Sequence, residues 1–76
     1  MDYILTSLID DPNDYKIFST ENEFDIDTEE RNMLGYFSNE KELAELLVSD
    51  NYWYKEEPNL AREDAEILMD DFNFGY

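Results

Sequence analysis

The chain of 76 residues contains no histidine and no cysteine. Histidine is the side chain that most often transfers protons in catalysis at neutral pH, and cysteine is the most nucleophilic of the common side chains. The two residue types also supply most ligands of structural zinc, and only cysteine forms disulfides. Their absence predicts that the protein is not an enzyme, has no catalytic residues and holds no zinc.

Glycine and proline are also scarce, with two residues of each type. Two isolated glycines do not form the glycine-rich loop that holds phosphate groups in nucleotide-binding proteins. A calcium-binding EF-hand loop needs glycine at its sixth position and glutamate at its twelfth. A loop that began at Asp25 would have Glu30 and Tyr36 at these positions. The sequence therefore predicts no cofactor and no dedicated metal site.

Long apolar runs and positive charge are missing as well. The longest apolar runs have three residues, whereas a membrane-spanning helix needs about 20. No basic residue precedes Lys16, so the N-terminus does not have the pattern of a signal peptide. Direct binding to nucleic acid needs many Lys and Arg side chains, and anionic lipid repels an acidic surface. We therefore expect a cytoplasmic protein that binds neither membranes nor nucleic acid directly.

Acidic residues, in contrast, are abundant. Twenty-one Asp and Glu against five Lys and Arg give a net charge of −16. A small domain needs a charge magnitude of only about 2–8 for solubility, and the excess destabilises a compact state. Hydrophobic residues still make up 42% of the chain and aromatic residues 16%, more than disordered acidic segments contain. The sequence thus predicts a single folded domain over residues 1–76 whose charge serves binding.

Three segments have the composition of β-strands. Tyr3–Ile9 and Tyr15–Ser19 are rich in apolar and β-branched residues, and the turn-forming residues of Asp10–Asp14 lie between them. This arrangement predicts a hairpin. Met33–Phe37 is expected to form a further strand.

The segment Glu23–Asp27 alternates strictly between acidic and apolar residues. Strict alternation predicts a half-buried strand with Phe24 and Ile26 facing inward. Glu23, Asp25 and Asp27 would then share its outer face at intervals of about 6.6 Å.

Two helices are expected in the second half of the chain. The first runs from about Asn39 to Ser49, because Asn39 and Glu42 have the spacing of a capping box. The second begins at Pro58, which suits the first turn of a helix, and Gly75 lies beyond its end. Its apolar stripe consists of Ala61, Ala65, Leu68 and Phe72. Together these elements predict an α+β fold, a small antiparallel sheet of three to four strands packed with two α-helices on one face.

The aromatic residues are expected to be mostly structural, since their large side chains would dominate so small a core. This group consists of Tyr3, Tyr15, Phe18, Phe24, Phe37 and Phe72. The cluster Tyr52–Tyr54 differs, because three neighbouring side chains cannot all point inward from an extended segment or loop. At least one should be exposed beside Glu56 and Glu57. We interpret the cluster as a candidate apolar anchor for a partner, with a core role as the alternative.

The spacing of the acidic residues resembles that of nucleic-acid phosphates. Glu63, Glu66 and Asp70 lie opposite the apolar stripe, about 4.5 and 6 Å apart along the helix, and nucleotides rise about 3.4 Å each. A compact chain of this size is roughly 30 Å across, and 30 Å of duplex carries about 17 or 18 charges. The predicted partner-binding residues are Glu23, Asp25, Asp27, Glu29, Glu30, Tyr52, Trp53, Tyr54, Glu56, Glu57, Glu63, Glu66, Asp70 and Asp71.

In size, acidity and aromatic content the whole chain resembles small phage-encoded DNA-mimic inhibitors of the anti-restriction and anti-CRISPR class. The resemblance implies an inhibitor that occupies the DNA- or RNA-binding site of a basic nucleic-acid-binding protein. Host defence or repair nucleases, such as a CRISPR effector or a restriction enzyme, are targets of this kind. The oligomeric state, monomer or dimer, stays open.

A second resemblance concerns Ser49–Glu56, which is similar to the Ser-Asp…Tyr-Tyr…Lys-Glu stretch of colicin nuclease immunity proteins. It implies an antitoxin that neutralises a cognate nuclease, built on a four-helix fold. The strand-like segment Tyr3–Asp27 does not suit that fold. A third alternative is an acidic regulatory adaptor.

Overall fold

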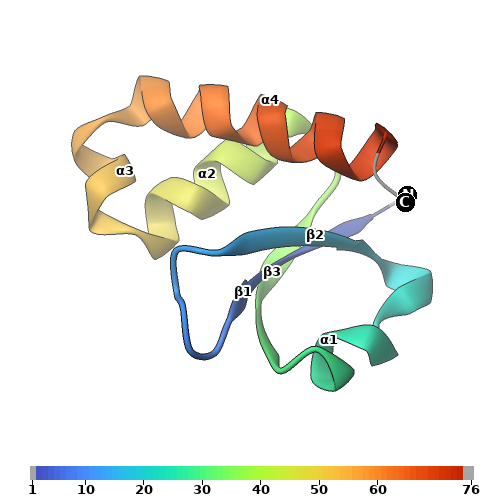
Figure 1. Cartoon of the computed structure of the whole chain (residues 1–76). Coiled ribbons are helices and arrows are strands. Elements are labelled where there is room, and N and C mark those ends of the chain that lie inside the picture. Colours follow the sequence, from blue (N-terminus) through green and yellow to red (C-terminus); the bar gives the residue numbers. More distant parts are fainter. Residues whose placement is uncertain (1, 75–76) are drawn as a thin grey trace.

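The computed structural model describes residues 2–74, and these residues form an α+β fold, as predicted (Figure 1). The elements follow one another as β1 (Tyr3–Leu8), β2 (Tyr15–Ser19), the 3₁₀ helix η1 (Thr20–Asn22), α1 (Phe24–Thr28), β3 (Arg31–Phe37), α2 (Glu40–Asp50), α3 (Tyr52–Glu56) and α4 (Pro58–Phe74). Gly75, which we expected just past the last helix, lies outside the described residues.

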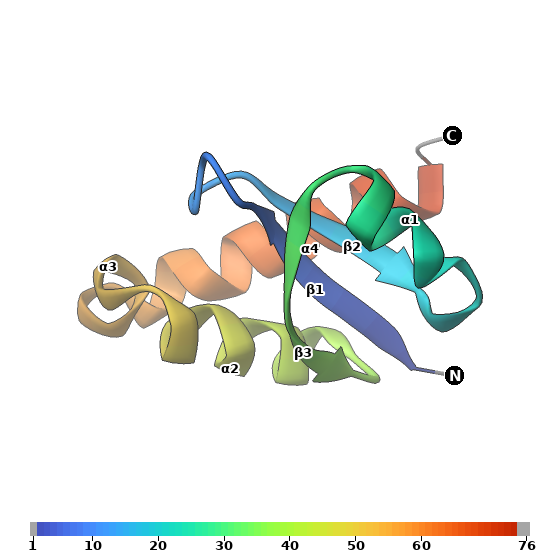
Figure 2. The same ribbon diagram turned by 90° about the horizontal axis from the view of Figure 1, so that it is seen from below.

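The three strands form an antiparallel sheet in the order β2-β1-β3, with β1 in the centre. β1 and β2 form the predicted hairpin, in which Leu5 lies opposite Ile17. On its other side β1 pairs with β3, where a register shift falls between Leu5 and Thr6. Since β2 and β3 both run antiparallel to β1, they run parallel to each other, and the chain between them must cross the sheet (Figure 2).

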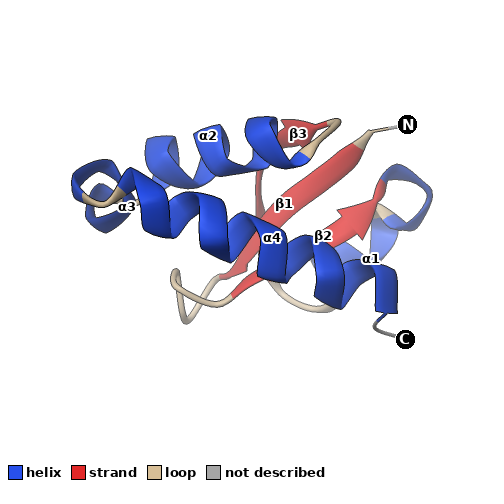
Figure 3. Ribbon diagram, turned by 90° about the horizontal axis from the view of Figure 1, so that it is seen from above, coloured by secondary structure: helices blue, strands red, loops and turns tan. Residues whose placement is uncertain are grey.

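The main core lies between one face of the sheet and the helices α2, α3 and α4. Leu5, Ile17 and Phe37 from the strands pack there against helix residues, which are Leu43, Ala44, Leu47, Tyr54, Ala61 and Ala65. Figure 3 shows α2 and α4 lying side by side over this face. The opposite face carries a smaller cluster of Ile4, Phe18 and Ile26, covered by α1. Side chains that alternate along β1 therefore enter two different clusters.

Local sequence signals define the ends of the helices. The Asn39 side chain accepts a hydrogen bond from the Glu42 backbone N–H at 2.9 Å, and a Glu42 carboxylate oxygen accepts one from the Ser38 N–H at 2.7 Å. The first bond satisfies a backbone donor that the first turn of α2 leaves free, and the second satisfies the N–H just before the capping residue. Asn51 begins α3 in the same way, accepting from the Trp53 N–H at 3.0 Å. Pro58 begins α4, as expected from its fixed backbone angle.

The predicted strand at Glu23–Asp27 is wrong, because this segment contains helix α1. Ile26 is buried, as expected, but Phe24 is 90% exposed rather than part of the core. The sheet order gives the physical reason. The segment joins two parallel strands on opposite sides of β1, and such a crossover usually contains a helix. One buried residue on a single helical turn then suffices to cover Ile4 and Phe18.

The prediction of an extended segment or loop at Tyr52–Tyr54 is also wrong, because these residues form the first part of the helix α3. The helix separates neighbouring side chains by about 100°, so adjacent residues enter different environments. The three-stranded sheet also differs from the four-helix fold that the resemblance to immunity proteins implies.

Candidate protein-binding surface

Nearly all the negative charge lies on the surface. Every Asp and Glu of the chain is exposed except Asp64, which is half-buried. Asp64 accepts a hydrogen bond from the Tyr54 hydroxyl at 2.6 Å. These exposed acidic residues give the surface a strong negative field.

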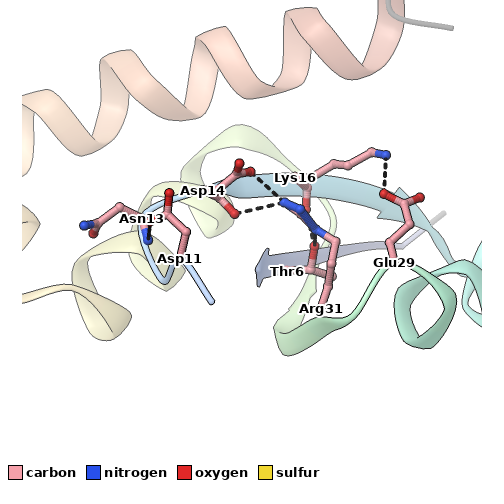
Figure 4. Close-up of polar contacts among 7 residues, drawn as sticks. All are labelled: Thr6, Asp11, Asn13, Asp14, Lys16, Glu29 and Arg31. Carbon is pink, nitrogen blue, oxygen red and sulfur yellow. Dashed lines mark hydrogen bonds and ion pairs between the residues drawn. The ribbon is translucent and has the colours of Figure 1, made fainter. Parts of the chain in front are cut away.

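Two of the five positive charges are neutralised within the sheet region (Figure 4). Arg31 is buried, and its guanidinium donates to the Asp14 carboxylate at 2.8 Å, to the Asp14 carbonyl at 2.9 Å and to the Thr6 hydroxyl at 3.1 Å. Lys16 forms an exposed ion pair with Glu29 at 2.9 Å, and its ammonium lies 4.9 Å from the centre of the Phe18 ring. Neither charge is available to balance the acids elsewhere.

The other three basic residues lie on the helical layer: Lys41 on α2, Lys55 on α3 and Arg62 on α4. Lys41 and Arg62 line a groove of about 700 Å³ between α2 and the first half of α4. Within residues 2–74 they form no ion pair with Glu45 or Glu66, although the helical spacing would allow one. Lys41 and Arg62 therefore give the groove between α2 and α4 two positive charges.

The segments on the two sides of β2 carry acidic residues and no basic ones. Residues 21–30, which include α1, contain six acidic and no basic residues. Residues 63–74, the second part of α4, contain five acidic and no basic residues. In Figure 1 β2 lies between these two segments, with α4 above it and α1 below it. The structure thus brings two purely acidic segments, distant in the sequence, to the two sides of one strand.

A groove of about 480 Å³ runs along this strand, and we call it the β2 groove. Its floor is β2, and both walls carry carboxylates. It is lined by Tyr15, Lys16, Ile17, Phe18, Ser19, Asn22, Asp25, Glu29, Leu68, Asp71 and Phe72. Of the predicted partner-binding residues, Asp25, Glu29 and Asp71 meet here.

Other predicted acidic residues of the first half lie apart from the β2 groove. Glu23 and Asp27 line a separate hollow with the exposed Phe24 and Met33, so the expected common face of Glu23, Asp25 and Asp27 does not exist. The Glu23 carboxylate accepts a hydrogen bond from the Tyr36 hydroxyl at 3.1 Å, and this bond and charge raise the pKa of Tyr36. Glu30 adopts a positive φ of 57° in the turn before β3.

The acidic residues of the second half also divide among several surfaces. Glu66 lines the groove between α2 and α4. Glu63 and Asp70 are exposed on α4, as the helical pattern predicted, and line none of these grooves. Glu56 and Glu57 are exposed at the end of α3.

The three residues of the aromatic cluster Tyr52–Tyr54 differ in burial, and only the exposed ones can contact a partner. Tyr52 is 73% exposed and Trp53 is 53% exposed, whereas Tyr54 is 6% exposed. The Tyr54 ring packs against Trp53 at 5.1 Å and Tyr15 at 6.1 Å between ring centres. Burial, followed by the hydrogen bond to Asp64, raises the pKa of the Tyr54 hydroxyl. Tyr54 is therefore structural, which corrects its place among the partner-binding residues, while Tyr52 and Trp53 remain accessible.

Sequence reasoning missed the apolar half of the β2 groove. Leu68 and Phe72 were expected only as core residues, yet both line the groove. It also missed the exposed Phe24 and Tyr36. The open edge of β2 could have been found from the expectation of a hairpin edge strand, but the walls depend on where α1 and α4 lie.

Within residues 2–74 no group of three or more carboxylates is placed to hold a metal ion. In the same range no helix combines the length and the apolar character needed to cross a membrane.

Comparison of the chain with protein-family models, with curated proteins and with solved structures finds no match. The two resemblances named above therefore stay hypotheses that depend on the residues of this chain.

Proposed function

We propose that the protein is a non-catalytic inhibitor that binds a basic nucleic-acid-binding protein and blocks its DNA or RNA site. One observation carries the proposal: the two segments that flank β2 contain eleven acidic residues and no basic one. Such a surface attracts a cationic channel and repels anionic molecules. A host defence or repair nuclease, such as a restriction enzyme or a CRISPR effector, is the class of target that fits, and the inhibitor would act in the host cytoplasm.

The dimensions of the protein support the same proposal. Its longest extent is 32 Å, and duplex DNA of that length carries about 19 phosphate charges at one per 1.7 Å. The net charge of the protein, −16, is close to this value. A positively charged channel built for a duplex would therefore meet a similar charge over a similar length.

Charge alone would attract many basic proteins weakly, so selectivity needs a shaped contact. Tyr52 and Trp53 supply exposed aromatic surface next to Glu56 and Glu57. Large aromatic side chains are enriched among the residues that dominate binding energy. We infer that the acidic surface attracts the partner and that α3 helps to select it.

The proposal is tested by affinity capture from a bacterial lysate on the immobilised protein, with duplex DNA as competitor. We expect the retained proteins to be nucleic-acid-binding proteins that duplex DNA displaces. A retained nuclease should lose its activity when the free protein is added in stoichiometric amount. Retained proteins that lack a nucleic-acid site, or that DNA does not displace, would contradict the proposal.

The same experiment separates the alternatives. An immunity protein would retain a single toxin nuclease. A regulatory adaptor would retain proteins whose activity does not depend on nucleic acid.

A further inference from the structure

The outer edge of β2 has backbone groups without a strand partner. β2 pairs with β1 alone, so it is an edge of the sheet. The Leu8 N–H bonds the Asp14 carbonyl at 3.1 Å, and antiparallel pairs alternate between bonded and non-bonded. The backbone N–H and C=O groups of Lys16 and Phe18 therefore form hydrogen bonds with β1. Those of Tyr15, Ile17 and Ser19 point away from β1.

No other element within residues 2–74 takes these backbone donors. Apart from the hydrogen bonds within helices and strands, the backbone N–H groups of Ile17 and Ser19 donate to no backbone or side-chain acceptor. Unpaired edges are templates on which another strand can add. Native proteins often protect such an edge with charged residues. In the β2 groove the charged residues are Lys16 and three acidic residues, Asp25, Glu29 and Asp71.

The two walls of the β2 groove differ in character. The α4 wall presents Leu68, Phe72 and Asp71. The α1 wall presents Asp25, Glu29 and Asn22. A strand added along β2 would direct its side chains alternately to the two walls. Every second side chain would then contact the largely apolar α4 wall, and those between them would meet the carboxylates of α1.

We propose that the β2 groove binds an extended, basic segment of the partner protein, which adds to the sheet as a fourth strand. The segment alternates between apolar and Lys or Arg side chains. Its backbone bonds the free groups of Tyr15, Ile17 and Ser19, and its cations pair with Asp25 and Glu29. The identification of the partner rests on the proposed function, but the binding mode rests on the groove itself.

Charge complementarity favours this occupant over a second copy of the chain. In a dimer formed through two β2 edges, Asp25, Glu29 and Asp71 of each copy would approach their own equivalents. Like charges brought together in this way oppose association. Lys16 is one cation in the groove against three carboxylates, and its exposed pair with Glu29 is of a kind that contributes little and can exchange partners.

The test uses a short, terminally blocked peptide that alternates valine and lysine, titrated into the full protein at low salt. We expect saturable binding of one peptide per protein, with amide shifts concentrated at Tyr15–Ser19 in NMR spectra. In antiparallel addition the valine residues lie opposite Ile17 and bond to β2. N-methylation of the valines should therefore weaken binding about tenfold or more, whereas N-methylation of the lysines should not. Equal binding by all three peptides would overturn the proposal.

A variant of the protein provides the matching control. The N–H of Ser19 points away from β1, and its φ of −80° suits proline. Ser19→Pro thus removes one outward donor without removing a bond of the sheet, and Ser19→Ala removes only the hydroxyl. We expect about tenfold weaker peptide binding for Ser19→Pro and unchanged binding for Ser19→Ala. Should Ser19→Pro not fold by circular dichroism, the N-methylated peptides decide the question on the unaltered protein.

The outcomes distinguish this inference from the proposed function. If the peptide fails to bind but capture still retains DNA-displaceable proteins, strand addition is wrong and inhibition by charge stands. If the peptide binds but the captured proteins lack nucleic-acid sites, the groove is confirmed and the proposed function is wrong. A doubling of molecular mass at low salt without peptide, together with amide shifts at Tyr15–Ser19 on dilution, would show that a second copy occupies the edge, which also overturns the inference.

Discussion

Tyr54 connects α3 to α4 through one short hydrogen bond, from its hydroxyl to the Asp64 carboxylate at 2.6 Å. Tyr54→Phe keeps the ring but leaves the half-buried Asp64 without this donor. We expect a loss of about 1–2 kcal/mol in the free energy of unfolding at pH 7, because a polar group loses its partner without regaining full hydration. Urea denaturation of both proteins measures the difference.

The same hydroxyl makes stability depend on alkaline pH. Burial and Asp64 raise the pKa of Tyr54 in the folded state, whereas in the unfolded chain it is about 10. The folded state therefore keeps a proton that the unfolded state loses. This contribution to stability is complete below pH 10 and is lost as the pH rises from about 10 toward the folded pKa. In Tyr54→Phe the decline above pH 10 should be shallower, and an equal decline would contradict the assignment.

Trp53 is the residue most suited to anchor a partner. It is 53% exposed on α3, and Asn51 fixes the start of this helix. We expect Trp53→Ala to weaken binding of a captured partner by about 2 kcal/mol, mainly through faster dissociation. Its cost in folding should be smaller, since about half of the Trp53 side chain is already exposed. Tyr52→Ala is measured beside it as the second candidate, because Tyr52 is also exposed on α3 and neighbours Trp53. Unchanged dissociation in both variants would place the anchor elsewhere.

At the scale of elements, α1 contains two apolar residues, Phe24 and Ile26, that differ in burial. Ile26 is buried against Ile4 and Phe18, whereas Phe24 is almost fully exposed. The conservative change Ile26→Val should cost about 1 kcal/mol of stability, because it leaves a small cavity. The drastic change Phe24→Ala should alter stability by less than about 0.5 kcal/mol. In thermal denaturation, a loss from Phe24→Ala at least as large as that from Ile26→Val would contradict the exposed position of Phe24 and favour the predicted strand, in which both side chains face inward.

This contrast shows which elements could be predicted from the sequence. The helix α2 was predicted within a residue at each end, because its signals, such as the capping side chain of Asn39, act within one turn. The helix α1 could not be predicted from five alternating residues, since a single helical turn with one buried side chain has the same pattern. The sheet order decides between the two, and that order depends on contacts distant in the sequence.

In the candidate site, too, features set by the local sequence could be predicted, and features set by contacts distant in the sequence could not. Exposure of the α4 acids was predictable, because they lie opposite a clear apolar stripe. The separation of Trp53 from Tyr54 was not, because it depends on Tyr15 and Asp64 from other elements. The β2 groove likewise requires α1 and α4 to lie on either side of one strand.

The acidic face of α4 is tested by charge reversal. We expect Glu63→Lys, Glu66→Lys and Asp70→Lys, combined in one variant, to abolish partner binding without unfolding, because all three side chains are exposed. The control variant reverses Asp2, Asp10 and Asp11, which are also exposed and line none of the grooves described above, and produces the same change in net charge. Binding assays at one salt concentration compare the two variants. Equal losses would indicate that only the total charge matters and that α4 is no defined interface.

At the scale of the whole molecule, the same charge has opposite effects on folding and on binding. Twenty exposed carboxylates and only five basic residues act on a body of 32 × 26 × 18 Å. Most of these charges therefore lie within a few Debye lengths of one another, since the Debye length is about 10 Å at 0.1 M salt. Their repulsion destabilises the folded state, and their attraction to a cationic partner accelerates association.

Salt should separate these two effects. Raising the NaCl concentration from about 50 to 500 mM shortens the Debye length to a few ångströms. We expect the melting temperature to rise, because screening relieves repulsion within the domain. Over the same range association with a captured partner should slow markedly while dissociation changes less, because steering acts on encounter and close packing acts on residence. Scanning calorimetry and stopped-flow association measure the two trends on the same samples. An association rate that is independent of salt would remove charge as the basis of recognition, even if the melting temperature rose as expected.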